Sequence, residues 1–175
     1  HCGGWDKIDG GQCTHAWALL TGCKDQYLIQ KTKGGKFACH AKFDPTTKKW
    51  APHGNSPSEG HQGLWQVPWP QLGGGGTGEL DEEELFLKRC AWDDENYLIG
   101  AASPGKSDRA KTNGIVDNHA YSVVDCRNDV AGTNIDLLQV RNPWGKGEIE
   151  KGMFSANGPG WRKYPQIKKL LKPVN

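Results

Sequence analysis

The chain has 175 residues with 22 basic and 20 acidic side chains, which gives a formal net charge of +2. This length suits a single domain, residues 1–175, with a sizeable core. The near-neutral charge argues against nucleic acid or an anionic membrane surface as a partner. No apolar run approaches ~18 residues, which argues against a membrane-spanning segment. No signal peptide opens the chain, and because it begins at His1 with Met153 as its only methionine, we expect a piece of a longer or processed protein.

Six cysteines are scattered along the chain without a Cys-x-x-Cys pair. This spacing predicts free, mostly buried thiols in a reducing compartment, and therefore a cytoplasmic (intracellular) protein. Zinc is the alternative, because Cys13 lies near His15 and Cys39 is next to His40. Neither pair has the spacing of zinc ligands, so we expect no metal site in this chain.

The first predicted element is a short helix over residues 12–20 that buries Ala16, Leu19 and Leu20. Alternating residues then predict strands at 25–31, 36–43 and, after a turn, 48–51.

Residues 52–79 are rich in proline and glycine and predict a long loop. The run Gly73–Gly76 predicts a flexible surface link. Trp65 and Trp69 could anchor this stretch to the core or form an exposed aromatic wall for a peptide, and burial is the favoured interpretation.

The clearest predicted helix begins at Asp81. Asp81 and Glu84 form a capping box, and Leu80 and Leu85 form the hydrophobic staple around it. The expected buried stripe consists of Phe86, Leu87, Cys90 and Ala91.

A strand at 97–102 and a polar loop at 103–117 follow this helix. Near the end of the chain, a last short helix is expected over residues 164–172, with Ile167, Leu170 and Leu171 facing inward.

Two further strands, 119–126 and 135–142, are separated by a polar loop and predict a hairpin. If Cys126 pairs with Ile135 and no bulge intervenes, the constant sum of paired residue numbers places His119 directly opposite Asn142. Directly opposed side chains share one face of a sheet, with Cβ atoms about 5 Å apart. The amide oxygen of Asn142 could then accept a proton from one imidazole nitrogen of His119.

A histidine held by one ring nitrogen presents the other nitrogen to a nucleophile. A neutral asparagine suits a cysteine nucleophile, because the working state is a thiolate–imidazolium pair that needs no further negative charge. A structural contact between His119 and Asn142 is the other interpretation, and the spacing alone leaves both open.

The segments His119-Ala-Tyr-Ser-Val and Arg141-Asn-Pro-Trp-Gly resemble the second half of the catalytic core of the calpains, papain-like intracellular cysteine proteases activated by calcium. Residues 10–22 are similar to the entry segment of that half, and residues 82–103 to its helix and strand. The resemblance is weak or absent from 23 to 79.

The resemblance implies that His119 is the general base and acid, that Asn142 orients it, and that Trp144 is the shielding aromatic residue. It also implies that the 103–117 loop is a flap over the substrate cleft, although an ordinary connecting loop would have the same composition. The expected fold is α+β: a twisted antiparallel sheet or open barrel with a few flanking helices, the right-hand subdomain of a papain-like core.

Several positions depart from the family pattern. No cysteine has the Gln-Gly-x-x-Gly-x-Cys-Trp context of the family's nucleophile. Asn118 stands where the family usually has glycine. Glu148 matches one calcium-binding position, but the next falls near Ala156, which has no ligand atom in its side chain.

We therefore expect the His/Asn half of an intracellular cysteine endopeptidase, inactive alone, with no cofactor of its own. Its partners would be a Cys-bearing subdomain of the same parent chain and a protein or peptide substrate, and the full-length parent could bind calcium. The alternative is a non-catalytic scaffold or interaction module with a calpain-like fold, and acyl transfer on another papain-like fold is a third interpretation.

Overall fold

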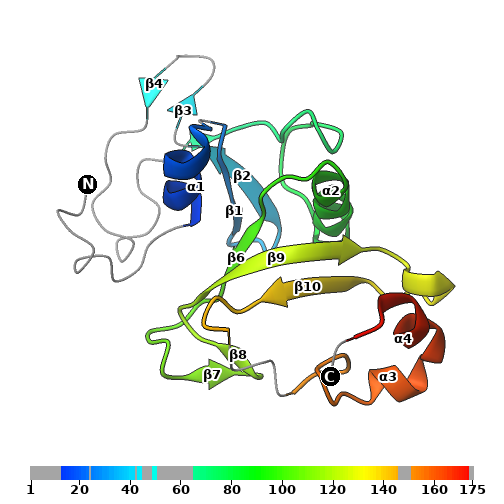
Figure 1. Cartoon of the computed structure of the whole chain (residues 1–175). Helices are drawn as coiled ribbons and strands as arrows, with labels where there is room; N and C mark the ends of the chain where they lie inside the picture. Colours follow the sequence, from blue (N-terminus) through cyan, green and yellow to red (C-terminus); the bar gives the residue numbers. More distant parts are fainter. Residues whose placement is uncertain are drawn as a thin grey trace. The chain divides into compact units, whose positions relative to one another are not determined.

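The computed structural model describes residues 13–23, 25–41, 43–44, 49–50, 65–145 and 151–173 (Figure 1). The chain divides into two compact units, residues 1–91 and 92–175, and each unit is described by itself. Among the described helices, none combines the length and apolar character needed to cross a membrane.

The first unit is built on a small antiparallel sheet with the strand order β1-β2-β5. Strand β1 pairs with β2 from Tyr27 opposite Ala41 to Lys31 opposite Phe37, as the alternating residues predicted. The elements are α1 (Cys13–Thr21), β1 (Tyr27–Lys31), β2 (Phe37–Ala41), β5 (Trp65–Gln66) and a separate pair of β3 (Phe43–Asp44) with β4 (Lys49–Trp50). Strand β5 was missed because two residues within a proline-rich stretch carry no periodicity.

Helix α1 forms where it was predicted, but its buried face differs. Leu19 and Leu20 are 70% and 82% exposed, and Ala16 is exposed as well, so the prediction that these residues pack inward is wrong. The half-buried face instead passes through Cys13 and Trp17, four residues apart on one side of the helix.

Helix α2 (Glu82–Asp94) begins with the predicted capping box. The Asp81 N–H donates to Glu84 Oε2 at 2.9 Å, and the Glu84 N–H donates to Asp81 Oδ1 at 2.8 Å. Leu85 is fully buried, but Leu87, predicted in the buried stripe, is exposed. The buried face of α2 is shifted from the predicted stripe, because the buried residues are Leu85 and, in the last turn, Trp92.

The glycine run belongs to a loop, residues 70–78, that is held at several points. The Lys88 ammonium donates to Gly73 O at 2.7 Å and to Gly75 O at 2.8 Å. The indole N–H of Trp69 donates to Gly78 O at 2.9 Å, and Trp69 is only 2% exposed. The prediction of a free, flexible link is therefore wrong, whereas the predicted burial of Trp69 is confirmed.

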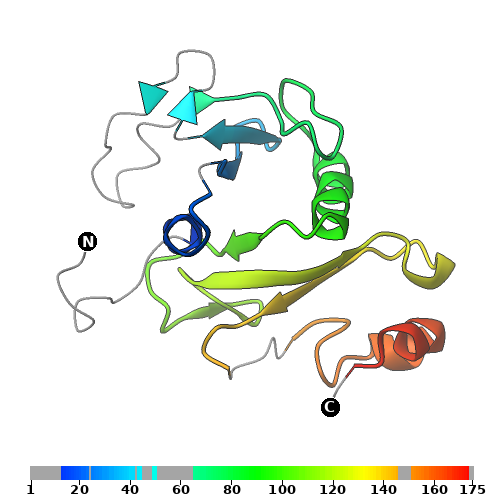
Figure 2. The same cartoon turned by 45° about the horizontal axis from the view of Figure 1, so that its top comes forward.

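The second unit contains an antiparallel sheet with the strand order β10-β9-β6. The long strand β9 lies between the other two (Figure 2). The strands are β6 (Gly100–Ala102), β9 (Ala120–Arg127) and β10 (Leu137–Arg141), with a two-stranded hairpin of β7 (Lys111–Thr112) and β8 (Ile115–Val116) inside the 103–117 loop.

The hairpin of β9 and β10 forms, but its predicted register is wrong. Leu138 pairs with Cys126, and the register shifts after Gln139, so that Val124 is left as a bulge residue. The connection is longer than predicted because it contains a 3₁₀ turn, η3 (Val130–Gly132), closed by a hydrogen bond from Val130 N to Ile135 O. Neither a bulge nor a structured connection can be recognised from the alternation of polar and apolar residues along the strands.

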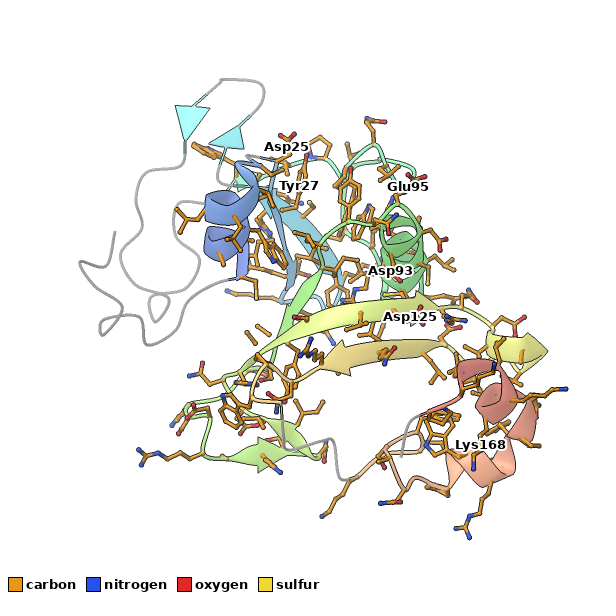
Figure 3. The ribbon with its side chains drawn as sticks, viewed as in Figure 1. Asp25, Tyr27, Asp93, Glu95, Asp125 and Lys168 are labelled. Carbon is orange, nitrogen blue, oxygen red and sulfur yellow. The ribbon has the colours of Figure 1, made fainter. Side chains whose placement is uncertain are left out.

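The core of the second unit lies around β9. The Asp93 carboxylate, on the last turn of α2, accepts a hydrogen bond from the Cys126 N–H at 2.9 Å. Asp93 is labelled in Figure 3, as is Asp125, the residue before Cys126 on β9. The C-terminal helices are α3 (Gly160–Lys163) and α4 (Pro165–Leu171), and α4 packs against η3. Ile167 is fully buried as predicted, whereas Leu170 is half exposed. The buried apolar residues of this unit are Trp92, Val116, Tyr121, Cys126, Val130 and Ile167.

Together the elements are α+β, with open antiparallel sheets and a few helices, so the predicted fold class is confirmed.

Candidate active site

The structure brings His119 and Asn142 together. His119 immediately precedes β9 and Asn142 immediately follows β10. The distance from His119 Nε2 to Asn142 Oδ1 is 2.8 Å. The pair meets although the register prediction was wrong: continuing the observed register would place Asn142 opposite Tyr121, and His119 is then its diagonal neighbour on the same face.

A second hydrogen bond identifies which nitrogen of His119 carries the proton. The backbone N–H of Trp144 donates to the same Asn142 Oδ1 atom at 3.0 Å. Because a backbone N–H can only donate, the shared atom is the amide oxygen and not the amide nitrogen. Nε2 of the neutral ring is therefore the donor, and Nδ1 is left with a free lone pair, as a base requires.

The sequence Asn-Pro-Trp-Gly explains how Asn142 is held. Gly145 N donates to Asn142 O at 3.1 Å, which closes a β-turn over residues 142–145. Asparagine at the first position, proline at the second and glycine at the fourth are the residues that such a turn favours. Gly145 has φ 67°, a value that glycine adopts without steric cost. The turn thus aims the Asn142 side chain at both donors.

Trp144 covers the pair. Its ring centroid lies 4.4 Å from that of His119, with the ring planes inclined by 50°. The side chain itself is 46% exposed. An apolar ring beside a hydrogen bond keeps water away from it, which is the role that the resemblance predicts for Trp144.

Two residues that the sequence analysis did not single out, Ser103 and Tyr121, also contact His119. Ser103 Oγ accepts a hydrogen bond from the His119 N–H at 3.0 Å. The ring of Tyr121 lies edge-on to the imidazole, with centroids 5.0 Å apart and planes at 90°. Tyr121 could have been found, since it is two residues from His119 on one face of a strand. Ser103 carries no such signal.

The 103–117 loop joins β6 to the residue before His119. Its last turn ends at Asn118, which has φ 47°. Asparagine adopts the left-handed region more readily than other residues with a side chain, so it can replace the usual glycine here. Asparagine at position 118 is therefore compatible with a left-handed backbone, which glycine also adopts readily.

Two buried thiols are poor candidates for a nucleophile that acts with His119. Burial raises the pKa of the Cys39 thiol to about 11, so this group is protonated at neutral pH. Cys126 lies seven residues along the chain from His119, which corresponds to roughly 20 Å of extended strand. Both observations agree with the lack of a nucleophile motif in the sequence.

The described residues do not form a calcium site. Within these residues no group of three or more His, Cys, Asp or Glu side chains could hold a metal ion. Ala156 has no side-chain oxygen, and Glu148 lies outside the described residues. Calcium requires about six to eight oxygen ligands, and this set does not fit that requirement.

Comparison with known proteins identifies a family for the chain. A sequence model of the calpain family cysteine proteases matches residues 1–173. The chain belongs to the calpain family. The match extends through residues 23–79, where the motifs alone showed little resemblance.

Individual calpains match shorter segments. The chain is 38% identical over 98 residues to the calpain-type cysteine protease DEK1 of Arabidopsis thaliana, which covers 55% of this chain and 4% of that protein. It is 39% identical over 66 residues to calpain clp-1 of Caenorhabditis elegans, with 37% and 8% covered. For human calpain-9 the identity is 35% over 66 residues, with 37% and 9% covered. The chain thus spans only a small part of each relative's length, and no solved structure matches it significantly.

Proposed function

We propose that this chain is the His/Asn-bearing half of a calpain-like cysteine endopeptidase. A cysteine thiol from a separate Cys-bearing subdomain would complete the site, and a protein or peptide would be the substrate. The observation that carries the proposal is the double acceptance by Asn142 Oδ1, which fixes the proton of His119 on Nε2 and leaves Nδ1 as the base.

In the proposed mechanism, Nδ1 of His119 takes the proton of the thiol, and the thiolate attacks the carbonyl carbon of the scissile peptide bond. The C–N bond then breaks, and the leaving amine receives the proton from the imidazolium. A water molecule next gives its proton to Nδ1 and attacks the thioester, which releases the acid and restores the thiol. Asn142 holds the ring in one orientation throughout, because its oxygen accepts from Nε2 in both the neutral and the charged ring.

The proposal is tested by mixing the purified chain with a Cys-bearing calpain subdomain and measuring hydrolysis of a fluorogenic peptide amide. The chain alone should be inactive, and the mixture should be active. His119→Ala should lower kcat/KM by about 10³-fold, in the range of general acid–base catalysis. Asn142→Ala should cause a smaller decrease, since the base remains but its orientation is lost.

Asn128→Ala is the matched control for Asn142→Ala, because Asn128 is exposed in the connection between β9 and β10. Its activity should equal that of the unchanged chain. Peptidase activity of the chain alone that depends on a thiol would contradict the proposal, as would a mixture whose activity survives His119→Ala.

A second candidate is a non-catalytic interaction module with the calpain fold. It is favoured by one observation, the absence of a nucleophile motif in these 175 residues. The sequence of the parent protein decides between the two, because this candidate requires that the family's nucleophilic cysteine be replaced there.

A further inference from the structure

Near the end of the 103–117 loop, two side chains bind the N–H and the carbonyl group of one residue, Val116. The Val116 N–H donates to the hydroxyl oxygen of Tyr121 at 2.9 Å. The Val116 carbonyl accepts a hydrogen bond from Ser103 Oγ at 2.6 Å. Val116 is 1% exposed and Tyr121 is 6% exposed, so water cannot replace either partner. A buried backbone group that loses its partner is costly, and these two bonds therefore hold the loop end firmly.

The same hydroxyl of Ser103 also holds the backbone of His119. Ser103 Oγ accepts from the His119 N–H at 3.0 Å, and the Ser103 N–H donates to His119 O at 2.9 Å. The hydroxyl proton is directed to Val116 O, since the alternative acceptor, His119 O, is farther away at 3.2 Å. Ser103 is thus a junction that joins the loop end to the backbone of His119.

Tyr121 makes a second connection between Val116 and His119. Its hydroxyl holds Val116, while the edge of its ring packs against the imidazole of His119. A displacement of Val116 therefore reaches His119 by two routes, through the Ser103 hydroxyl to the backbone and through the Tyr121 ring to the side chain.

Close packing at the loop base strengthens this connection. A Cβ atom added to Gly105 would lie 2.5 Å from Asp117 Cβ, so the two stems of the loop are already in contact. The Asn118 N–H also donates to Pro104 O at 3.2 Å. Since the stems cannot slide past each other, a movement at the loop base has to carry residues 116–118 with it.

We propose that Ser103 and Tyr121 are positioning residues that couple the conformation of the 103–117 loop to the orientation of the His119 imidazole. This inference rests on the proposed function of His119. A substrate that contacts the loop would thereby help to set the base in its working position, and loss of either hydroxyl would uncouple the two.

The test uses Ser103→Ala and Tyr121→Phe, each of which removes one hydroxyl and little else. Ser107→Ala is the control for the first, because it removes a hydroxyl of the same loop, one that accepts from Arg109 N. Tyr97→Phe, at an exposed tyrosine, is the control for the second. Ser103→Thr restores the hydroxyl and serves as the rescue variant.

The first readout needs no activity. In the 175-residue chain, amide hydrogen exchange should become faster at His119 in Ser103→Ala and at Val116 in Tyr121→Phe. The ¹⁵N chemical shifts of the His119 ring should change in both variants and remain unchanged in the two controls. Unchanged ring signals in both Ser103→Ala and Tyr121→Phe would overturn the inference.

The second readout is the kinetics of the assembled enzyme. Each variant should lower kcat about tenfold with little change in KM, since a positioned base acts in the transition state. The double variant should lose less than the product of the two single effects, because both hydroxyls act through Val116. A rise in KM alone would show that the hydroxyls only shape the loop, and would overturn the inference.

The two proposals can fail separately. If the unchanged assembly has no activity while the His119 ring signals respond as expected, the proposed function fails, whereas the coupling of the loop to the His119 ring is supported. If the assembly is active but neither variant moves the ring signals or kcat, the coupling fails and the proposed function remains. Should Ser103→Ala not fold, Tyr121→Phe, which removes only the other hydroxyl, still decides the outcome.

Discussion

Two loops of this chain are held by different chemistry. The 70–78 loop of the first unit is fixed by the charged ammonium of Lys88 and by the indole of Trp69. The 103–117 loop of the second unit is fixed by the neutral hydroxyls of Ser103 and Tyr121. A glycine-rich or polar composition therefore does not show by itself that a loop is unattached to the rest of the chain.

The two sets of anchors also differ in what else they contact. Lys88 and Trp69 bind carbonyl groups of the 70–78 loop. Ser103 and Tyr121 contact His119 itself. Breaking the first set should therefore cost stability alone, whereas breaking the second set should cost catalytic activity at similar stability.

The largest expected effect on stability comes from the anchor of the 70–78 loop. Trp69→Ala should lower the free energy of unfolding by about 3–5 kcal/mol, because it removes a fully buried ring and leaves a cavity. The matched control is Trp144→Ala, at a tryptophan that is 46% exposed, which should change stability by less than about 1 kcal/mol. Urea denaturation of both variants measures the difference, and equal losses would contradict the distinction between the two tryptophans.

The next effect concerns the charged group on α2 that holds the same loop. Lys88→Met keeps a long apolar side chain but removes the ammonium that donates to Gly73 O and Gly75 O. It should lower the free energy of unfolding by about 1.5–3 kcal/mol, the usual range for hydrogen bonds to a charged group. Lys106→Met, at an exposed position in the 103–117 loop, is the control and should stay within about 0.5 kcal/mol. Thermal denaturation at low and high salt checks both values.

The sequence predicted those features of the fold that depend on neighbours in the chain. The capping box of Asp81 and Glu84 is local, and so is the alternation that predicts β1 and β2. Features that depend on distant partners were missed or misplaced. Lys88 reaches back 13 and 15 residues to the glycine run, and the outward Leu19 and Leu20 cannot be identified from the helix alone.

The candidate site shows the same difference between features set by chain neighbours and features set by distant partners. The His119–Asn142 contact could be predicted because two strands of one hairpin bring both residues to the same end. The register could not, since the bulge at Val124 depends on how the connection packs and not on alternation. Ser103 was missed because its role comes from a bond to a residue 16 positions away.

The smallest expected effect concerns the turn before His119, where Asn118 has φ 47°. Asn118→Ala should lower the free energy of unfolding by about 1 kcal/mol, because alanine adopts the left-handed region at a higher cost than asparagine. Asn118→Gly should stay within about 0.5 kcal/mol, since the easier backbone geometry is offset by the greater entropy of glycine in the unfolded chain.

Asn113 offers a matched comparison, because it has φ 53° in the turn between β7 and β8 and lies farther along the loop from His119. Asn113→Ala should destabilise the chain by a similar amount of about 1 kcal/mol. In the assembled enzyme, however, only Asn118→Ala should also lower kcat. Asn118 is the residue before His119, and its N–H donates to Pro104 O at the base of the loop. Equal kinetic losses in the two alanine variants would show that the whole loop sets the position of His119, and not the segment from Val116 to Asn118 that Ser103 and Tyr121 hold.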